Sequence, residues 1–146
     1  MSAAVSGPAS NGSVLVVRLP DAMPAERAEA AIEAAFDPGS AAALATDLPG
    51  DLDWASSGVI CVFLGRREDG GWSLAIQGAS LVDGELQVRA RETRPAPGVD
   101  RPGPSFAADC ATIDRPALPV GTLPARADDT VTDEFIVAGD LEVPAP

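Results

Sequence analysis

The most continuous apolar run in the chain is GVICVFLG, Gly58–Gly65, and it constrains the fold more than any other segment. An uninterrupted apolar run, without polar residues at alternate positions, is typical of a strand that is buried on both faces. The sequence therefore predicts a central strand at Gly58–Gly65, with the rest of the fold built around it.

The chain has 14 prolines and 14 glycines among 146 residues, which is well above ordinary usage. Such a composition favours short elements with many turns and stiff connections. The length fits one domain with one real core. We expect a mainly β domain, a small sandwich or partly open barrel with one packed α-helix, and so the α+β class.

A long hairpin is predicted directly after the central strand. The segments Trp72–Val82 and Glu85–Thr93 flank Asp83-Gly84, a strong two-residue turn signal. Regular pairing across this turn would place the apolar residues before Gly78 on the same face as the arginines of the second strand. One extra residue returns them to the core face, so we predict a β-bulge at Gly78–Ala79.

The N-terminal third is predicted to contain a leader, a strand and a helix. Residues 1–13 are poor in large apolar side chains and are interpreted as a flexible leader. The β-branched run Ser13–Pro20 is typical of a strand. Residues 24–36 repeat their apolar positions at helical spacing, which predicts a helix anchored by Ile32 and Phe36.

The C-terminal third is rich in proline and then in acidic residues. We assign residues 14–127 to the β domain and residues 128–146 to an acidic tail that could dock as a strand. The stretch ATIDRPALPVGTLPARA, 111–127, can supply one last strand, but its prolines place that strand at an edge or a bulge.

Several residue types are missing, and their absence excludes whole reaction mechanisms. The sequence contains no His, no Tyr and no Lys, because all ten basic residues are Arg. Nucleophiles activated by histidine, Schiff-base lysines and imidazole metal ligands are therefore excluded. Carboxylate chemistry stays open, but aromatic residues are only 4% of the chain and a sugar-binding cleft is usually lined with them. We expect no enzyme, no catalytic residue and no cofactor.

Two acidic clusters could in principle hold a hard cation through oxygen ligands. The first contains Asp47, Asp51 and Asp53, and the second contains Asp128, Asp129, Asp133 and Glu134. Neither has EF-hand spacing, so we interpret both as solvated loop charge and keep the first as a weak candidate for a metal site.

The formal net charge of -12 opposes binding to phosphate backbones and to anionic lipid. The most basic stretch is Gln87–Arg94, where arginines alternate with apolar residues as on a solvent-facing strand. We therefore expect neither a nucleic-acid nor a membrane partner.

The two cysteines, Cys61 and Cys110, have neither metal-site nor C-x-x-C spacing. We interpret Cys61 as a small buried hydrophobic residue and leave open whether it pairs with Cys110. The N-terminus lacks a basic start and a long apolar core, so it does not look like a secretory signal. As written, the sequence favours a cytoplasmic location.

Four short motifs follow one another at specific positions between residues 50 and 126. They are Asp53-Trp54, Phe63-Leu64-Gly65, Gly70-Gly71-Trp72 and Pro95-Ala96-Pro97-Gly98. Because these motifs occur in this order, the chain resembles the PrcB C-terminal domain family of bacterial protease-complex subunits. It departs from the family pattern at Asp69, where Thr is usual, and at Trp72, where Tyr is usual.

The resemblance implies a compact, mainly β domain acting as a non-catalytic accessory subunit of a protein complex, in some members a protease. It implies no catalytic residue. Many members of the family are extracytoplasmic, which leaves that location open for this chain.

The first functional hypothesis is a protein-interaction or assembly module, with a protein partner or a second copy of the chain. Gly70, Gly71 and Trp72 are its candidate contact residues, because aromatic side chains beside rigid turns are favoured interface anchors. The competing structural role for Trp72, which we favour, is to plug one end of the sandwich or barrel. The alternative function is a small-ligand-binding β domain with a pocket near the same turn.

Overall fold

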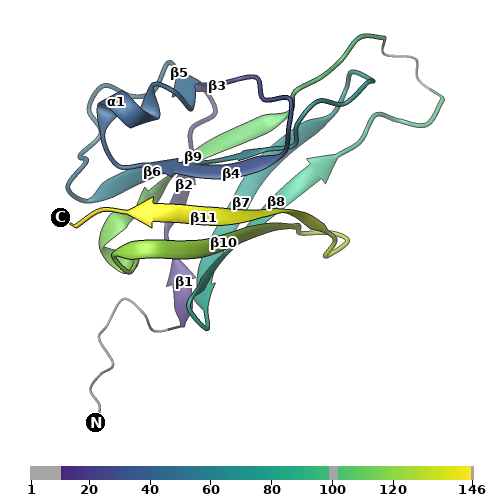
Figure 1. Ribbon diagram of the computed structural model, residues 1–146. Coiled ribbons are helices and arrows are strands. Elements are labelled where there is room, and N and C mark those ends of the chain that lie inside the picture. Colours follow the sequence, from purple (N-terminus) through teal and green to yellow (C-terminus); the bar gives the residue numbers. More distant parts are fainter. Residues whose placement is uncertain (1–10, 99–101, 146) are drawn as a thin grey trace.

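The computed structural model describes residues 11–98 and 102–145, and β-strands dominate it (Figure 1). A five-stranded sheet has the order β1-β7-β8-β10-β11, a four-stranded sheet has the order β2-β9-β6-β4, and β3 pairs with β5 alone. The expected fold class, mainly β with a small helical part, is confirmed. The elements are β1 (Gly12–Val14), β2 (Val16–Arg18), β3 (Met23–Pro24), β4 (Ala31–Ala35), α1 (Pro38–Ala41), β5 (Ala45–Thr46), β6 (Ser57–Phe63), β7 (Ser73–Val82), β8 (Glu85–Thr93), β9 (Ala108–Asp114), η2 (Arg115–Ala117), β10 (Gly121–Asp129) and β11 (Phe135–Val143).

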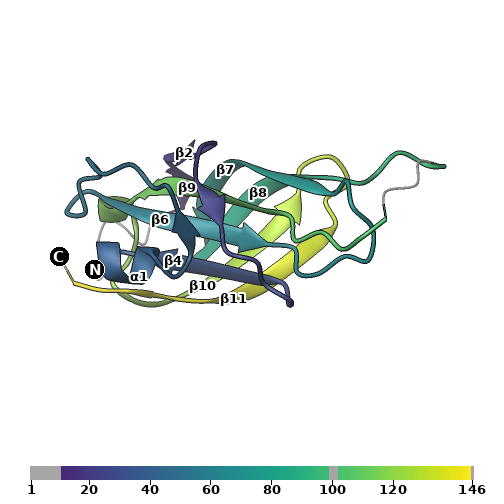
Figure 2. The ribbon, with the colours of Figure 1, turned by 90° about the horizontal axis from the view of Figure 1, so that it is seen from above.

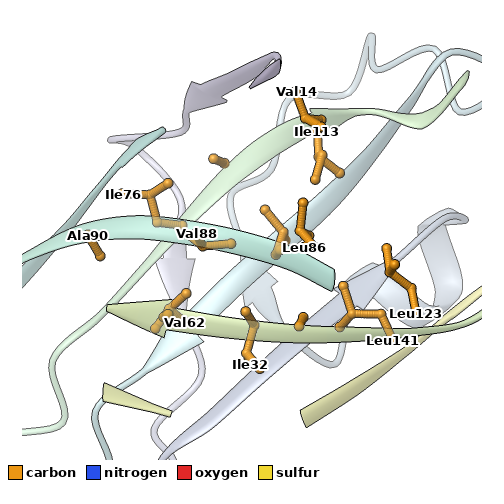
Figure 3. Packing of buried hydrophobic residues seen from close by; sticks show 14 of the residues in the cluster. Val14, Ile32, Val62, Ile76, Leu86, Val88, Ala90, Ile113, Leu123 and Leu141 are labelled. Atoms are coloured by element: carbon orange, nitrogen blue, oxygen red, sulfur yellow. The ribbon is translucent and has the colours of Figure 1, made fainter. Parts of the chain in front are cut away.

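The main core lies between the two larger sheets. Side chains from both sheets meet there, including Val62 and Ile113 from one sheet and Leu86, Val88 and Leu123 from the other (Figure 3). Each of these five residues is almost completely buried. Full burial of such a side chain contributes about 1.5–3 kcal/mol, so this core is the main source of stability.

The two sheets are joined along one side and only touch along the other. On the joined side, β1 pairs with β7 and β2 pairs with β9, and the chain crosses between the sheets at Leu15. On the other side β4 lies beside β11, where a Cβ atom on Gly139 would come within 3.4 Å of the Ile32 Cγ2 atom. No ladder links β4 to β11 in the described part of the chain, so the β structure does not close into a barrel.

The central strand is confirmed as β6, which pairs with β4 on one side and β9 on the other. Its side chains alternate between two clusters, with Ile60 and Val62 in the main core and Val59, Cys61 and Phe63 in a second cluster. The second cluster is covered by α1, by the small β3–β5 sheet and by the loops around them (Figures 1 and 2). This outer layer explains why the run is apolar at every position.

The long hairpin is also present, as β7 and β8. Asp83 and Gly84 have φ values of +51° and +81°, as a two-residue type I′ turn requires. The register shifts between Ile76 and Gly78, so that Gln77 is the extra residue of the bulge. The bulge lies one residue before its predicted position, and it does turn Ile76 into the core.

The helix predicted for residues 24–36 is wrong. Met23–Pro24 forms β3 and Ala31–Ala35 forms β4, which pairs with β6. The spacing of four between Ile32 and Phe36 keeps both on one side of a strand as well as on one side of a helix, and both lie in the main core. Pairing with the buried central strand outweighs the helix propensity of the alanines. The helix that does form, α1, begins where the predicted one ended.

The C-terminal segment docks as a strand, as the sequence allowed, but it is part of the domain, so the predicted boundary at residue 128 is wrong. β10 continues to Asp129, and β11 pairs with β10 along its length. Val137, Leu141 and Val143 of β11 are buried in the main core. Removing this strand would expose that part of the core, because these side chains cover it.

Two further expectations concern the ends of predicted segments. The stretch 111–127 does not form a single edge strand, since it contains the end of β9, η2 and most of β10, which lies between β8 and β11. Residues 1–10 of the predicted leader lie outside the described residues, whereas Gly12 and Ser13 belong to β1.

No helix in the described residues is long and apolar enough to cross a membrane.

Candidate functional site

Trp72 lies just before β7 at one end of the sandwich. Its ring is half-buried against the edge of the main core. The guanidinium carbons of Arg67 and Arg94 lie 5.0 and 5.7 Å from the ring centroid. The Glu92 carboxylate is 3.7 Å from Arg67 and 3.8 Å from Arg94. Trp72 therefore covers part of the core and carries a layer of paired charges on its exposed side.

The glycine turn before Trp72 is held in place by the proline-rich link. Gly71 has a φ of +88°, a backbone conformation that favours glycine. Arg67 and Ser105 exchange two backbone hydrogen bonds of 2.9 Å, and the Ser105 hydroxyl donates to the Asp69 carbonyl oxygen at 2.7 Å. Gly70, Gly71 and Trp72 thus lie in one anchored turn, and the arginines over the Trp72 ring are already paired with Glu92.

The weak metal candidates Asp47, Asp51 and Asp53 are not assembled into a site. Asp53 accepts a hydrogen bond from the Ala55 backbone N–H at 3.1 Å, which fixes a turn. Asp47 has a φ of +58°, the left-handed conformation that aspartate tolerates in turns. Within residues 11–98 and 102–145, no group of three or more His, Cys, Asp or Glu side chains is arranged to hold a metal ion.

In the second acidic cluster, Asp129 has a structural role. Its buried carboxylate accepts hydrogen bonds from the backbone N–H groups of Glu92, Val131 and Thr132 and from the Thr132 hydroxyl. These donors, led by the Glu92 N–H, lower the pKa of Asp129 to about 2. Asp129 therefore stays ionised at neutral pH and fixes the turn between β10 and β11.

The cysteine pairing that the sequence left open is present as a disulfide between Cys61 and Cys110. The two residues face each other on β6 and β9, with Cα atoms 4.1 Å apart, and both are buried. They lie in the second cluster, beneath the outer layer. The disulfide therefore links the two central strands of the four-stranded sheet.

A buried carboxylate links the two sheets to each other. Asp109 of β9 accepts hydrogen bonds from Arg18 Nε at 2.7 Å and Arg18 Nη2 at 3.1 Å. It also accepts the Ile76 backbone N–H of β7 at 2.7 Å, next to the bulge. The bulge disrupts regular strand pairing at this point, and the Asp109 side chain satisfies the N–H group.

β11 ends at the opposite end of the sandwich, at the left of Figure 1. Val143 and Pro144, at this end of β11, line two neighbouring hollows. The first has a volume of about 290 Å³ and is mainly apolar. The second has a volume of about 330 Å³ and includes two carboxylates. The first is lined by Ala55, Arg115, Pro116, Leu118, Val120, Val143 and Pro144, and the second by Ala34, Ala35, Phe36, Asp37, Ser40, Glu142, Val143 and Pro144.

Arg115 organises this end from inside. Its Nη1 atom donates to the carbonyl oxygens of Trp54 at 2.7 Å and Phe36 at 3.5 Å. Its Nη2 atom donates to the carbonyl oxygens of Pro144 at 3.4 Å and Ala145 at 3.1 Å. One side chain therefore joins the ends of β4 and β11 to the loop before β6.

Sequence reasoning did not identify either hollow. Their lining residues come from four separate parts of the chain, and none of these parts carries a recognisable motif. Pro116 lies in the stretch whose prolines predict an edge or a bulge, and Pro144 lies in the predicted acidic tail. The signal that could have drawn attention to Arg115 is its position as a lone cation between Asp114 and a proline-rich apolar stretch.

Comparison of the chain with protein-family models, with curated proteins and with solved structures finds no match. The resemblance to the PrcB C-terminal domain family therefore stays a prediction from the sequence.

Proposed function

We propose that this chain is a non-catalytic protein-interaction domain that serves as an accessory or stabilising subunit of a larger complex. The observation that carries the proposal is the apolar hollow beside Val143 and Pro144, which lies open on a cross-linked β scaffold. Val120, which lines the hollow, is 60% exposed. The sequence resemblance favours a protease as the central component of the complex.

A rigid scaffold supports this function because preorganised surfaces lose little conformational freedom when they bind. The Cys61–Cys110 disulfide links two strands, and Asp109 links the two sheets. Arg115 holds the hollow itself by donating to carbonyl groups of three segments, at Phe36, at Trp54 and at Pro144–Ala145. An exposed apolar residue in such a fixed setting is suited to contact another protein.

The alternative, a small-ligand-binding domain, is less well supported by the same geometry. Pockets for drug-sized ligands usually enclose about 300–1,000 Å³ and bury most of the ligand. The hollow that Trp72 lines, near the turn where the ligand pocket is predicted, measures about 270 Å³, and the apolar hollow beside Val143 measures about 290 Å³. The exposure of Val120 shows that the wall of the hollow beside Val143 is open to solvent. This hollow accommodates a side chain of another protein better than a separate molecule.

We also propose that the protein works in an oxidising, extracytoplasmic compartment. Buried disulfides are typical of secreted and periplasmic proteins and are rare in the reducing cytosol. The Cys61–Cys110 disulfide supports this location over the cytoplasmic one favoured by the N-terminus. Alkylation of free thiols under denaturing conditions, at the moment the source cells are lysed, followed by mass spectrometry, tests it: both cysteines should be protected, and full alkylation would overturn the proposal.

The interaction function is tested by purifying the tagged full chain from its source cells and measuring the mass of what elutes. We expect one partner in a fixed ratio, retained by the variant Val131→Lys and lost by Val120→Lys. Both residues are exposed valines, 63% and 60%, near opposite ends of the sandwich, so the first is a matched control for the second. A monomer with no partner in fixed ratio, for the wild type as well, would overturn the proposed function.

A further inference from the structure

We propose that the end surface around Val143 and Pro144 binds a basic segment of a partner protein, with a large apolar side chain in the first hollow and a neighbouring Lys or Arg in the second. This inference rests on the proposed interaction function and specifies the chemistry of the partner. The two hollows share one wall, so residues close together in one peptide can occupy both.

The first hollow suits an apolar anchor. Leu118 and Val143 form buried parts of its wall, and Val120 forms its exposed part. A dry cavity of about 150 Å³ is enough for a benzene ring. A hollow of about 290 Å³ therefore has room for one large aliphatic or aromatic side chain together with part of its backbone.

The second hollow suits a cation. Asp37 and Glu142 both line it, both are exposed, and no basic residue is among its described lining residues. The Ser40 backbone N–H and then the Ser40 hydroxyl donate to Asp37 and lower its pKa, so this carboxylate is ionised at neutral pH. The net charge of -12 adds a long-range attraction for a basic segment.

Among the residues that the structure describes, Arg115 is the one basic side chain that lines either hollow, and its position disfavours an acidic ligand. Both terminal nitrogens already donate to backbone carbonyl oxygens, and they support the wall of the hollow from behind. Only the buried Nε atom has no hydrogen-bond partner. The exposed charges around the surface are therefore carboxylates.

Charge favours a basic peptide over a second copy of this chain as the occupant. The second hollow carries the carboxylates of Asp37 and Glu142, which attract a basic segment. A second copy of this chain would instead bring two strongly acidic molecules together, which electrostatic repulsion opposes.

The test is selection from a random peptide library displayed on phage, with the oxidised full chain as the immobilised target. We expect the enriched peptides to share one large apolar residue within a few positions of Lys or Arg. Failure to enrich any family of peptides, or enrichment of acidic or uncharged ones, would overturn the inference.

An enriched peptide is then synthesised, and its affinity for the variants is measured by calorimetry at two salt concentrations. Val120→Lys should weaken binding roughly tenfold or more, since it removes an apolar contact and adds a repelling charge. Glu142→Gln should weaken binding about two- to fivefold, with a smaller effect at high salt. The controls Val131→Lys and Glu134→Gln, near the other end, should change the affinity less than about twofold.

These measurements separate failure of the inference from failure of the proposed function. Equal losses in Val120→Lys and Val131→Lys, or none in either, would place the peptide elsewhere and overturn the inference. If the copurification experiment nevertheless yields one partner in a fixed ratio, the interaction function stands and only the chemistry proposed for this surface fails. Circular dichroism and the melting temperature of each variant show that the fold is intact.

Discussion

The two ends of the sandwich use arginine in opposite ways. At the Trp72 end, Arg67 and Arg94 lie over an aromatic ring and pair with the Glu92 carboxylate. At the other end, Arg115 turns inward and donates to backbone carbonyl groups of three segments. The first arrangement neutralises charge at the surface. In the second, the arginine supports the backbone beneath the surface, and the nearby carboxylates of Asp37 and Glu142 have no basic side chain beside them in the second hollow.

The same contrast appears in the hollows at the two ends. A hollow of about 320 Å³ beside the β10–β11 turn is lined by charges of both signs, including Arg91, Arg94 and Glu134. The hollows beside Val143 combine an apolar wall with two carboxylates. Charges that are already paired gain little from a new ligand, so the Val143 end is better prepared to bind a basic partner.

The largest expected loss of stability comes from removing the disulfide, which lies in the part of the sandwich that both ends share. The disulfide lies in β6 and β9, and these strands lead to the Trp72 turn at one end and to Arg115 at the other. The double variant Cys61→Ala, Cys110→Ala should lose about 4 kcal/mol of unfolding free energy, because the disulfide closes a loop with a sequence separation of 49. Urea unfolding of the oxidised wild type and the variant measures this difference, and a loss below about 1 kcal/mol would contradict it.

The next effect concerns the Val143 end alone. Arg115→Ala removes four hydrogen bonds to carbonyl groups and should reduce the unfolding free energy by about 3 kcal/mol. Hydrogen exchange should speed up for the amides of β11 near Val143. The matched control is Arg67→Ala at the other end, and an equal loss in both variants would remove the contrast between the two ends.

The third effect is a pH dependence at the Trp72 end. Asp129 has a pKa of about 2 in the folded protein, below the ordinary value of 3.8. Its contribution to stability is therefore complete above about pH 4 and is lost as the pH falls from there through about 2. The variant Asp129→Asn should be less stable at neutral pH and should show a smaller loss between pH 4 and pH 2. A parallel pH profile for the wild type and the variant would contradict this role.

The smallest effect is expected from the surface charges over Trp72. Arg67→Ala should cost about 1–2 kcal/mol, because it removes a weak cation–π contact, a weak surface ion pair and one hydrogen bond to the Leu64 carbonyl oxygen. The ring should become more exposed, which acrylamide quenching of tryptophan fluorescence detects in a Trp54→Phe background. A loss as large as that of Arg115→Ala would show that the arginines at both ends are structural.

The elements that could be predicted from the sequence are those with a local cause. The apolar run at Gly58–Gly65 needs burial on both faces wherever it lies, and Asp83-Gly84 favours one turn in almost any context. The bulge followed from the need to keep Ile76 in the core. The turn at Gly70 and Gly71 could also be predicted from its own residues, because glycine tolerates the backbone conformation that the turn requires.

The predictions that were wrong or incomplete depend on contacts between distant residues, which a local sequence pattern does not reveal. The alanine-rich segment around Ile32 is compatible with a helix and a strand, and pairing with β6 decided between them. Leu141 could not be assigned to the core before β11 was paired with β10. The hollows were missed because Val120, Glu142 and Asp37 are far apart in sequence and meet only in the fold.

By itself, the sequence determined that the fold is mainly β, that β6 is its centre and that histidine or lysine chemistry is excluded. Only the tertiary structure decided that Cys61 faces Cys110, that Arg115 supports the end of the sandwich and that an apolar hollow lies beside two carboxylates. The reason is that burial preference and turn conformation act on neighbouring residues, whereas strand pairing brings distant residues together.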